Sequence, residues 1–146
     1  MNQARDAGPR MDVGSLQAFL RAEFPQVADD FEVERAGPME ARIRLKVAER
    51  HLRPGGTVSG PSLFALADVS MYLALLATIG PEALAVTTSC AMDFMRKPAA
   101  GRDLVGSARL LKVGRALAVG DVLIRSEGAE EPVARASLTY SIPRQR

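Results

Sequence analysis

The apolar positions along the chain change period several times, and each period predicts one kind of element. Between residues 39 and 47, apolar side chains alternate with polar, mainly basic ones, as in a strand with one wet face. Residues 31–35 alternate in the same way, and Gly37-Pro38 between the two segments predicts a hairpin turn. Four further strands are expected after residue 84, separated by turn-forming residues: 85–95, 104–113, 116–124 and 133–142.

Two segments have helical spacing instead. Apolar residues recur at that spacing between residues 14 and 22, and Pro25 ends this short amphipathic segment. Residues 61–77 are apolar nearly all round and are stopped by Gly80-Pro81, and a helix of that composition is normally buried. The order of one helix, two strands, a long buried helix and four strands predicts an α+β domain whose sheet wraps around one helix.

A single carboxylate, Asp68, interrupts the long apolar segment. A buried carboxylate costs several kcal/mol unless it is paired, hydrogen-bonded or protonated. No Lys, Arg or His lies within one helical turn of Asp68. Chemistry is a common reason for such a residue, and the structural alternative is a cap on another element or a distant arginine.

Composition narrows the class of protein. The 146 residues fit one domain, and the net charge of +2 comes from scattered basic residues, which does not favour nucleic-acid binding. With only Cys90 and His51, an intramolecular disulfide and a zinc site of several Cys or His are excluded, and no metal is expected. Residues 1–12 are expected to be disordered and residues 13–146 to form the domain.

The start of the chain does not resemble a signal peptide, so a cytoplasmic location is expected. The apolar segment around residues 61–79 has nearly the length of a membrane span of roughly 20 residues. Asp68 at its centre would cost about 2.5–3.5 kcal/mol on insertion scales. The amphipathic strands also need this helix as a core, so no membrane span is predicted.

Four short motifs resemble one family. Ser59-Gly60 followed by Leu66-Ala67-Asp68 resembles the His-Gly-Gly…Leu-Ala-Asp signature of PaaI-type hot-dog acyl-CoA thioesterases, with the same spacing from glycine to acid. Residues 92–98 with Gly101, the turn Gly114-Arg115 and the strand 136–140 are similar to three further segments of that family, in the same order. The resemblance covers roughly residues 30–143 and implies the hot-dog fold, an antiparallel sheet wrapped around one long central helix.

The resemblance implies hydrolysis of a small or aromatic acyl-CoA thioester to the free acid and CoA, with no cofactor beyond the CoA of the substrate. Asp68 would be the base or the nucleophile, and the backbone N–H of Gly60 would polarise the thioester carbonyl. A helix N-terminus suits an oxyanion because it presents free N–H groups and a partial positive charge. Pro61 has no N–H, so Gly60 is the plausible donor.

Gly60 and Asp68 are eight residues apart on one helix, which is about 12 Å at 1.5 Å rise per residue. They cannot both touch one thioester carbon, so the two groups must come from different subunits. The mechanism therefore predicts an obligate homodimer with two equivalent sites. The family agrees with this, because its minimal unit is a dimer that is often paired again into a tetramer.

The chain departs from the family at Ser59, where a histidine is usual, and at Pro61, where the second glycine stands. Ser59 can form hydrogen bonds but cannot be a cation near neutral pH. His51, just before the Gly-rich loop, is a candidate substitute for the family histidine, or a surface or cap residue. Thr88 or Ser89 on the strand after the helix is a candidate to orient Asp68 or water across the dimer. The alternative is that these residues are there only because of their ordinary β-propensity.

Three basic residues lie at turns, where the family's basic residues meet the phosphates of CoA: Arg96, Lys97 and Arg115. Solvated surface charge is an equally good account of each. Two other functions stay open on the same fold. The first is a non-catalytic acyl-CoA binding or regulatory module. The second, ranked lower, is a dehydratase or hydratase, which needs a catalytic histidine on the active-site elements. A plain structural domain would leave Asp68 unexplained.

Overall fold

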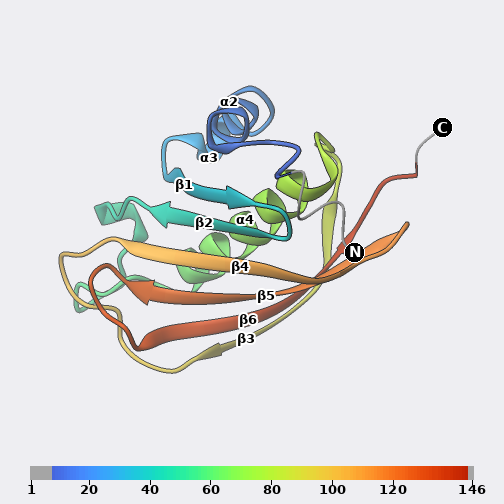
Figure 1. The fold of residues 1–146 in the computed structure, drawn as a ribbon. Coiled ribbons are helices and arrows are strands. Elements are labelled where there is room, and N and C mark those ends of the chain that lie inside the picture. The colour runs from blue at the N-terminus through green and yellow to red at the C-terminus, as the bar shows by residue number, and fades with distance from the viewer. Residues whose placement is uncertain (1–7, 145–146) are drawn as a thin grey trace.

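The structure is a computed structural model that describes residues 8–144 (Figure 1). The helices and strands, in chain order, are α2 (Val13–Glu23), α3 (Pro25–Ala28), β1 (Phe31–Gly37), β2 (Glu40–Leu45), the 3-10 turn η1 (Glu49–His51), α4 (Gly60–Ile79), β3 (Val86–Phe94), β4 (Leu104–Val113), β5 (Leu117–Ser126) and β6 (Pro132–Ser141).

The strands form one six-stranded sheet in the order β1-β2-β4-β5-β6-β3, and every neighbouring pair is antiparallel. Figure 1 shows this sheet running along the whole length of α4, with α2 and α3 beside the β1 edge. Twelve of the 20 residues of α4 are buried, because the sheet curls around the helix. This is the hot-dog fold that the sequence predicts, an α+β domain with one central helix.

Two glycines let the sheet approach α4 closely. A Cβ atom added at Gly106 on β4 would lie 2.5 Å from the hydroxyl oxygen of Ser70, and one at Gly120 on β5 would lie 2.7 Å from the sulfur of Met71. Real Cβ atoms do not tolerate such distances, since protein interiors are close-packed. The middle of the sheet is therefore fixed against the middle of the helix, which positions the residues of α4 relative to the strands.

The predicted elements match the observed ones to within a few residues, with two differences at the N-terminal end. Asp12 caps α2, its carboxylate accepting from the N–H of Ser15 at 2.8 Å. Pro25 ends α2 as predicted but also begins the single turn α3, which the sequence pattern did not predict. Proline suits the first position of a helix, because its missing N–H would have no partner there.

The prediction of a disordered segment over residues 1–12 was too long at its C-terminal end. Residues 1–7 lie outside the described residues. Over residues 8–12 the chain packs on the domain: the N–H of Arg10 donates to the carbonyl of Ala77 at 2.7 Å, and Met11 is buried in the core.

By length and composition, α4 passes the test for a membrane span, and it is the one helix among the described residues that does. Two thirds of its most apolar window is buried inside the domain. Because most of this apolar helix is packed inside the sheet, α4 is the core helix of this fold.

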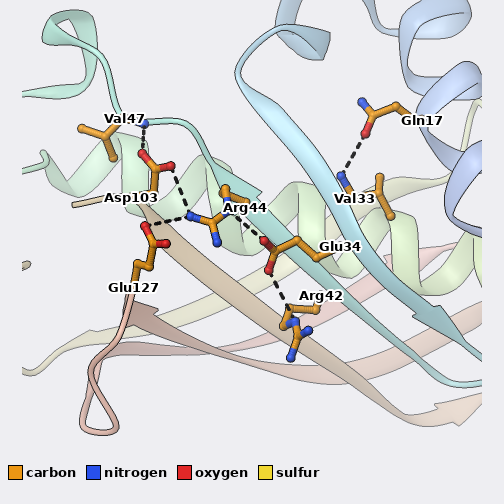
Figure 2. Close-up of polar contacts among 8 residues, drawn as sticks. All are labelled: Gln17, Val33, Glu34, Arg42, Arg44, Val47, Asp103 and Glu127. Atoms are coloured by element: carbon orange, nitrogen blue, oxygen red, sulfur yellow. Dashed lines mark hydrogen bonds and ion pairs between the residues drawn. The ribbon is translucent and has the colours of Figure 1, made fainter.

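A cluster of charged residues on the outer side of the sheet ties its strands together at one end (Figure 2). The guanidinium of Arg44 on β2 forms ion pairs with Glu34 of β1 at 2.7 Å, Glu127 at 2.9 Å and Asp103 at 3.2 Å. Asp103 also accepts from the N–H of Val47 at 2.9 Å. The hydrogen bond to Glu34, with the other two acids, raises the pKa of Arg44 far above its ordinary range. The cluster joins β1, β2 and the turn segments beside β4 and β5.

The two edges of the sheet are treated differently. At the β1 edge, the side-chain amide of Gln17 on α2 accepts from the N–H of Val33 at 2.9 Å and donates to the carbonyl of Phe31 at 3.2 Å (Figure 2). At the other edge, β3 pairs only with β6, and its residues Val86 and Phe94 are more than half exposed. Exposed strand edges readily pair with another chain.

Candidate active site

The N-terminus of α4 presents one free backbone donor. Ser59 caps the helix: its hydroxyl oxygen accepts from the N–H of Ser62 at 3.3 Å, and its carbonyl accepts from the N–H of Leu63 at 3.0 Å. Pro61 has no N–H to offer. Within residues 8–144, the N–H of Gly60 forms no hydrogen bond, so it is the first-turn group available to an anion.

Asp68 lies two turns further along α4, half-buried, and two hydroxyl groups hold one of its oxygens. Tyr140 of β6 donates to Oδ1 of Asp68 at 2.7 Å and lies 3.1 Å from the backbone carbonyl of the same residue. Thr87 of β3 donates to the same Oδ1. Neither of the structural accounts of Asp68, a cap on another element or a distant arginine, applies. Its partners are neutral hydroxyls on two different strands.

A β-bulge decides which hydroxyl of β3 reaches Asp68. Thr87 pairs with Tyr140 and Ser89 pairs with Thr139, so Thr88 is an extra residue between them. Its hydroxyl donates instead to the carbonyl of Thr139 at 3.3 Å, and both Thr88 and Ser89 are exposed. Within the chain, the β3 hydroxyl that contacts Asp68 is therefore that of Thr87, which the sequence analysis did not select. A role for Thr88 or Ser89 across a subunit interface stays a prediction.

Tyr140 is almost fully buried, and burial followed by the charge of Asp68 raises its pKa well above the ordinary value. Its hydroxyl therefore stays protonated and remains a donor to the carboxylate at any working pH. Its ring stacks on that of Tyr72, with centroids 6.2 Å apart, and the hydroxyl of Tyr72 donates to the carbonyl of Ala83 at 3.1 Å. Both tyrosine hydroxyls are thus engaged, and the rings are left as apolar surface.

One face of α4 stays uncovered. Gly60, Phe64 and Asp68 are spaced four residues apart, which places them on the same side of the helix. Phe64, in the N-terminal part of the helix, is 42% exposed, although Leu63 and Leu66 beside it are buried. The candidate catalytic groups therefore line an exposed stripe, and they remain about 12 Å apart along it.

Asp68 opens onto a cavity of about 390 Å³, here called the acidic cavity. The α2–α3 connection, α4, β6 and residues 83–87 enclose it. The only charged groups in its lining are Asp68 and Glu23, and both are acids. The rest of the lining is mostly apolar or aromatic, and its residues are Phe24, Gln26, Val69, Tyr72, Ala83, Ala85, Val86, Thr87 and Tyr140.

Gly60 opens onto a second cavity, of about 430 Å³, here called the basic cavity. Its charged residues are Arg53, Arg96 and Lys97, with no acid in the lining. Arg96 forms an ion pair with Glu131 at 2.9 Å, whereas Lys97 has no ion-pair partner among the residues that the structure describes. The sequence analysis selected Arg96 and Lys97, together with Arg115, as CoA contacts and did not select Arg53, which comes from a separate loop.

Arg115 is separated from this pair. It lies in the turn between β4 and β5, whereas Gly60 contacts the side of Phe94 at the far end of β3. The strand pairing places these at opposite ends of the sheet, as Figure 1 also shows. Within one chain, the three basic residues predicted for CoA therefore do not form one site.

His51 lines neither cavity. It is buried in η1, where Nδ1 accepts from the N–H of Ala48 at 2.9 Å. Nε2 lies 3.3 Å from a carboxylate oxygen of Asp30 without hydrogen-bond alignment. Burial, followed by the charge of Arg50, lowers the pKa of His51. It is thus placed as a structural residue, and its position does not support the role of substitute for the family histidine. Ser59, which stands in the family histidine's place, has its hydroxyl engaged in the helix cap.

Cys90 also faces the inner side of β3, where it packs against the core. Burial, followed by the charge of Asp68, raises the pKa of its thiol, which keeps it neutral. In the described part of the chain, no three His, Cys, Asp or Glu side chains gather in a way that could hold a metal ion.

Comparison with known proteins gives one consistent result. Residues 55–133, more than half of the chain, match the model of the thioesterase superfamily. A protein of Pseudomonas aeruginosa that is named as an esterase is 31% identical over 101 residues, which are 69% of this chain and 74% of that protein.

Two solved structures extend the likeness over most of the fold. A protein from a Silicibacter species, named as a thioesterase, is 60% identical with a TM-score of 0.86 and covers 92% of this chain and 94% of its own. A variant of the phenylacetic acid degradation protein PaaI from Thermus thermophilus is 32% identical with a TM-score of 0.71, and the match covers 82% of this chain and 99% of that chain.

Proposed function

Since this chain belongs to the thioesterase superfamily, with the PaaI-type hot-dog fold, we propose that it hydrolyses a small or aromatic acyl-CoA to the free acid and CoA. Membership makes it a hydrolytic thioesterase. The acyl-CoA substrate, the roles of the residues and the assembly are the proposal.

The observation that carries the proposal is the unequal use of the two Asp68 oxygens. Thr87 and Tyr140 both donate to Oδ1, and neither donates to Oδ2. Two donors on one oxygen fix the carboxylate in one orientation. Oδ2 is then the oxygen left to act on a water or a thioester carbon in the acidic cavity that Asp68 lines.

The proposed reaction uses this atom and one backbone donor. Oδ2 of Asp68 takes a proton from a water molecule whose oxygen attacks the thioester carbon. The N–H of Gly60 donates to the oxyanion that forms, because a helix N-terminus is suited to developing negative charge. The carbon–sulfur bond then breaks, CoA leaves as the thiolate and takes up a proton, and the acid remains. Direct attack by Oδ2 on the carbon is the alternative first step.

A second subunit completes the site. Gly60 and Asp68 of one chain are too far apart to meet one carbonyl group, but both lie on the exposed stripe of α4. Two such stripes packed in antiparallel fashion bring Gly60 of each chain beside Asp68 of the other. Pairing of the open β3 edges supports the same two-fold arrangement, which gives two equivalent sites in a homodimer.

The dimer also assembles the predicted CoA contacts. An antiparallel pair places the β4–β5 turn of one chain, with Arg115, at the end of the partner that carries the basic cavity. Arg96, Lys97 and Arg53 of that cavity then join Arg115 around the phosphates of CoA, while the acyl group enters the acidic cavity. The charge of each cavity matches the part of the substrate assigned to it.

The first experiment is release of CoA thiol from a panel of acyl-CoA esters by the wild type and by Asp68→Asn. We expect turnover to fall by about 10²–10⁴-fold in the variant, which is the usual contribution of a general base. Size-exclusion chromatography with light scattering checks that both proteins are dimers. Wild-type binding of CoA esters without turnover would support the non-catalytic module instead.

Mixing two inactive variants tests whether the site is shared. Asp68→Asn and Gly60→Pro each destroy both sites of their own dimers, since proline has no N–H. After subunit exchange, half of the dimers are mixed and one of their two sites has an intact Asp68 and an intact Gly60. Activity should return to about a quarter of the wild-type value. If both groups acted within one chain, mixing would restore nothing.

A further inference from the structure

The acidic cavity carries information about the acyl group itself. We propose that it binds the acyl group and selects an uncharged, apolar one, and that Glu23 and Phe24 of the α2–α3 connection set this selectivity. The inference rests on the proposed function, because it takes Asp68 as the group beside the thioester. It adds the substrate class and two residues outside the family motif.

Charge is the first argument. The lining holds two carboxylates, Asp68 and Glu23, and no Lys, Arg or His. An acyl group that ends in a carboxylate would lie close to one or both acids with no cation to offset the repulsion. Repulsion between like charges that are close together in a partly desolvated cavity disfavours binding of such an acyl group. A methyl or aryl end meets no such penalty.

Hydrogen-bonding capacity is the second argument. Two of the side chains that could bind a polar acyl group are already engaged, because Tyr140 donates to Asp68 and Tyr72 donates to the carbonyl of Ala83. What these residues offer the cavity is the surface of two stacked rings. The aliphatic side chains of Val69, Ala85 and Val86 add apolar surface, and Gln26 is the one uncharged polar side chain of the lining that forms no hydrogen bond among the described residues. Burial of apolar acyl carbons there stabilises the bound ester in proportion to the area removed from water.

Position is the third argument. Phe24 stands between α2 and α3, and its N–H donates to the carbonyl of Leu20 at 2.8 Å, which fixes the connection. Its side chain is 38% exposed, although it lines the cavity, so it has surface left for a ligand. Glu23, one residue earlier, is exposed, and burial, followed by the charge of Glu23, raises the pKa of Tyr72. Glu23 and Phe24 therefore form the side of the acidic cavity that the N-terminal helices contribute.

The test compares two esters with four acyl carbons that differ in charge, butyryl-CoA and succinyl-CoA. The wild type is expected to favour butyryl-CoA strongly. Glu23→Lys replaces an acid by a cation and should shift the ratio of kcat/KM values toward succinyl-CoA by about tenfold. Glu130→Lys makes the same change of charge in the turn before β6, on neither cavity, and should leave the ratio as in the wild type.

A second variant tests the apolar wall. Phe24→Ala enlarges the cavity, so the ratio of octanoyl-CoA to butyryl-CoA turnover should rise several-fold, and benzoyl-CoA in the same panel separates an aryl from an aliphatic preference. Thioether analogues of the same esters, which cannot be hydrolysed, give the same ratios as dissociation constants by calorimetry. Selectivity is thus measured even if the wild type shows no turnover, which would count against the proposed function alone. Equal binding of the butyryl and succinyl analogues by the wild type, or equal shifts in Glu23→Lys and Glu130→Lys, would overturn the inference.

Discussion

The two cavities beside α4 differ in charge although one helix serves both. The cavity at Asp68 is lined by two acids and no base, and the cavity at Gly60 by three bases and no acid. An acyl-CoA is itself divided into a neutral acyl end and an anionic phosphate end, joined at the thioester. Under the proposed function, the two recognition tasks are separated along the helix, one at each cavity. In the proposed dimer, the reacting bond lies where the acid of one subunit meets the helix N-terminus of the other.

After the loss expected for Asp68→Asn, the largest effect is expected at the Gly60 end. Gly60→Pro removes the N–H proposed for the oxyanion, and loss of one such donor costs about 10²–10³-fold in kcat. Gly60→Ala is the matched control, because it keeps the N–H, and its Cβ would lie 3.7 Å from the ring of Phe94, an ordinary contact. Steady-state kinetics on the best ester measures both. Similar losses in the two variants would mean that shape, and not the donor, matters at Gly60.

A smaller loss is expected at the acidic end. Tyr140→Phe removes one hydrogen bond to Asp68 and keeps the stacked ring, and a hydrogen bond to a charged group is worth about 1.5–3 kcal/mol. We expect kcat/KM to fall by roughly 10–100-fold.

Tyr72→Phe is the control for this change. It removes a hydroxyl from the wall of the same cavity, but one that donates to the carbonyl of Ala83 and not to the acid. Its kcat/KM should fall much less, because no hydrogen bond to Asp68 is lost. Equal losses in Tyr140→Phe and Tyr72→Phe would show that Tyr140 only packs and does not position the carboxylate.

The charge of the basic cavity predicts a modest effect on binding. Lys97→Gln should raise KM for acyl-CoA about two- to fivefold with kcat little changed, because a solvent-exposed contact to a phosphate is worth about 1 kcal/mol or less. The effect should shrink as salt is added. Lys46→Gln removes the same charge from a residue that lines neither cavity and should leave KM unchanged. A rise in KM for both variants would point to the overall charge of the protein.

The smallest expected effect is on stability. Because the pKa of His51 is lowered from 6.5 in the folded chain, the unfolded chain binds that proton more readily as the pH falls. Neutral His51 therefore contributes to the free energy of unfolding. This contribution is complete above pH 6.5 and is lost as the pH falls from there toward the lower pKa of the folded state. Thermal melts at pH 7.5 and 5.5 measure it, and His51→Gln should flatten the difference. The other titrating groups change the melting temperature with pH by the same amount in the variant and in the wild type.

The fold could be predicted from the sequence because its signals are local. Each of these signals depends on neighbouring residues: the strict alternation in β2, the glycines and prolines at the turns and the long apolar run of α4. Asp68 and Gly60 could be selected because a carboxylate in an apolar helix and a glycine at its start are visible as such. The prediction of two subunits followed from helix geometry and the proposed mechanism, and it stays a prediction.

The remaining site residues depend on long-range geometry that the local pattern does not contain. Side chains alternate between the two faces of a strand, so counting back from Cys90 and Met92, which face the core, leads to Thr88. The β-bulge adds one residue to β3, and Thr87 therefore takes the position beside Asp68. Phe24 reaches the acidic cavity through a turn, α3, that no periodic pattern marks. Arg53 joins Arg96 and Lys97 only because two loops fold against the same end of α4.

Gln17 has a consequence for how far the assembly can grow. By taking up the N–H of Val33 and the carbonyl of Phe31, one amide side chain occupies the place that a further strand would fill on β1. If two chains join through β3, the enlarged sheet therefore ends in a glutamine on both sides. Addition of strands then stops at two chains, so the chain can pair through its β3 edge without forming fibres through its β1 edge. We expect Gln17→Ala to free the backbone groups of β1 for pairing and to favour higher aggregates.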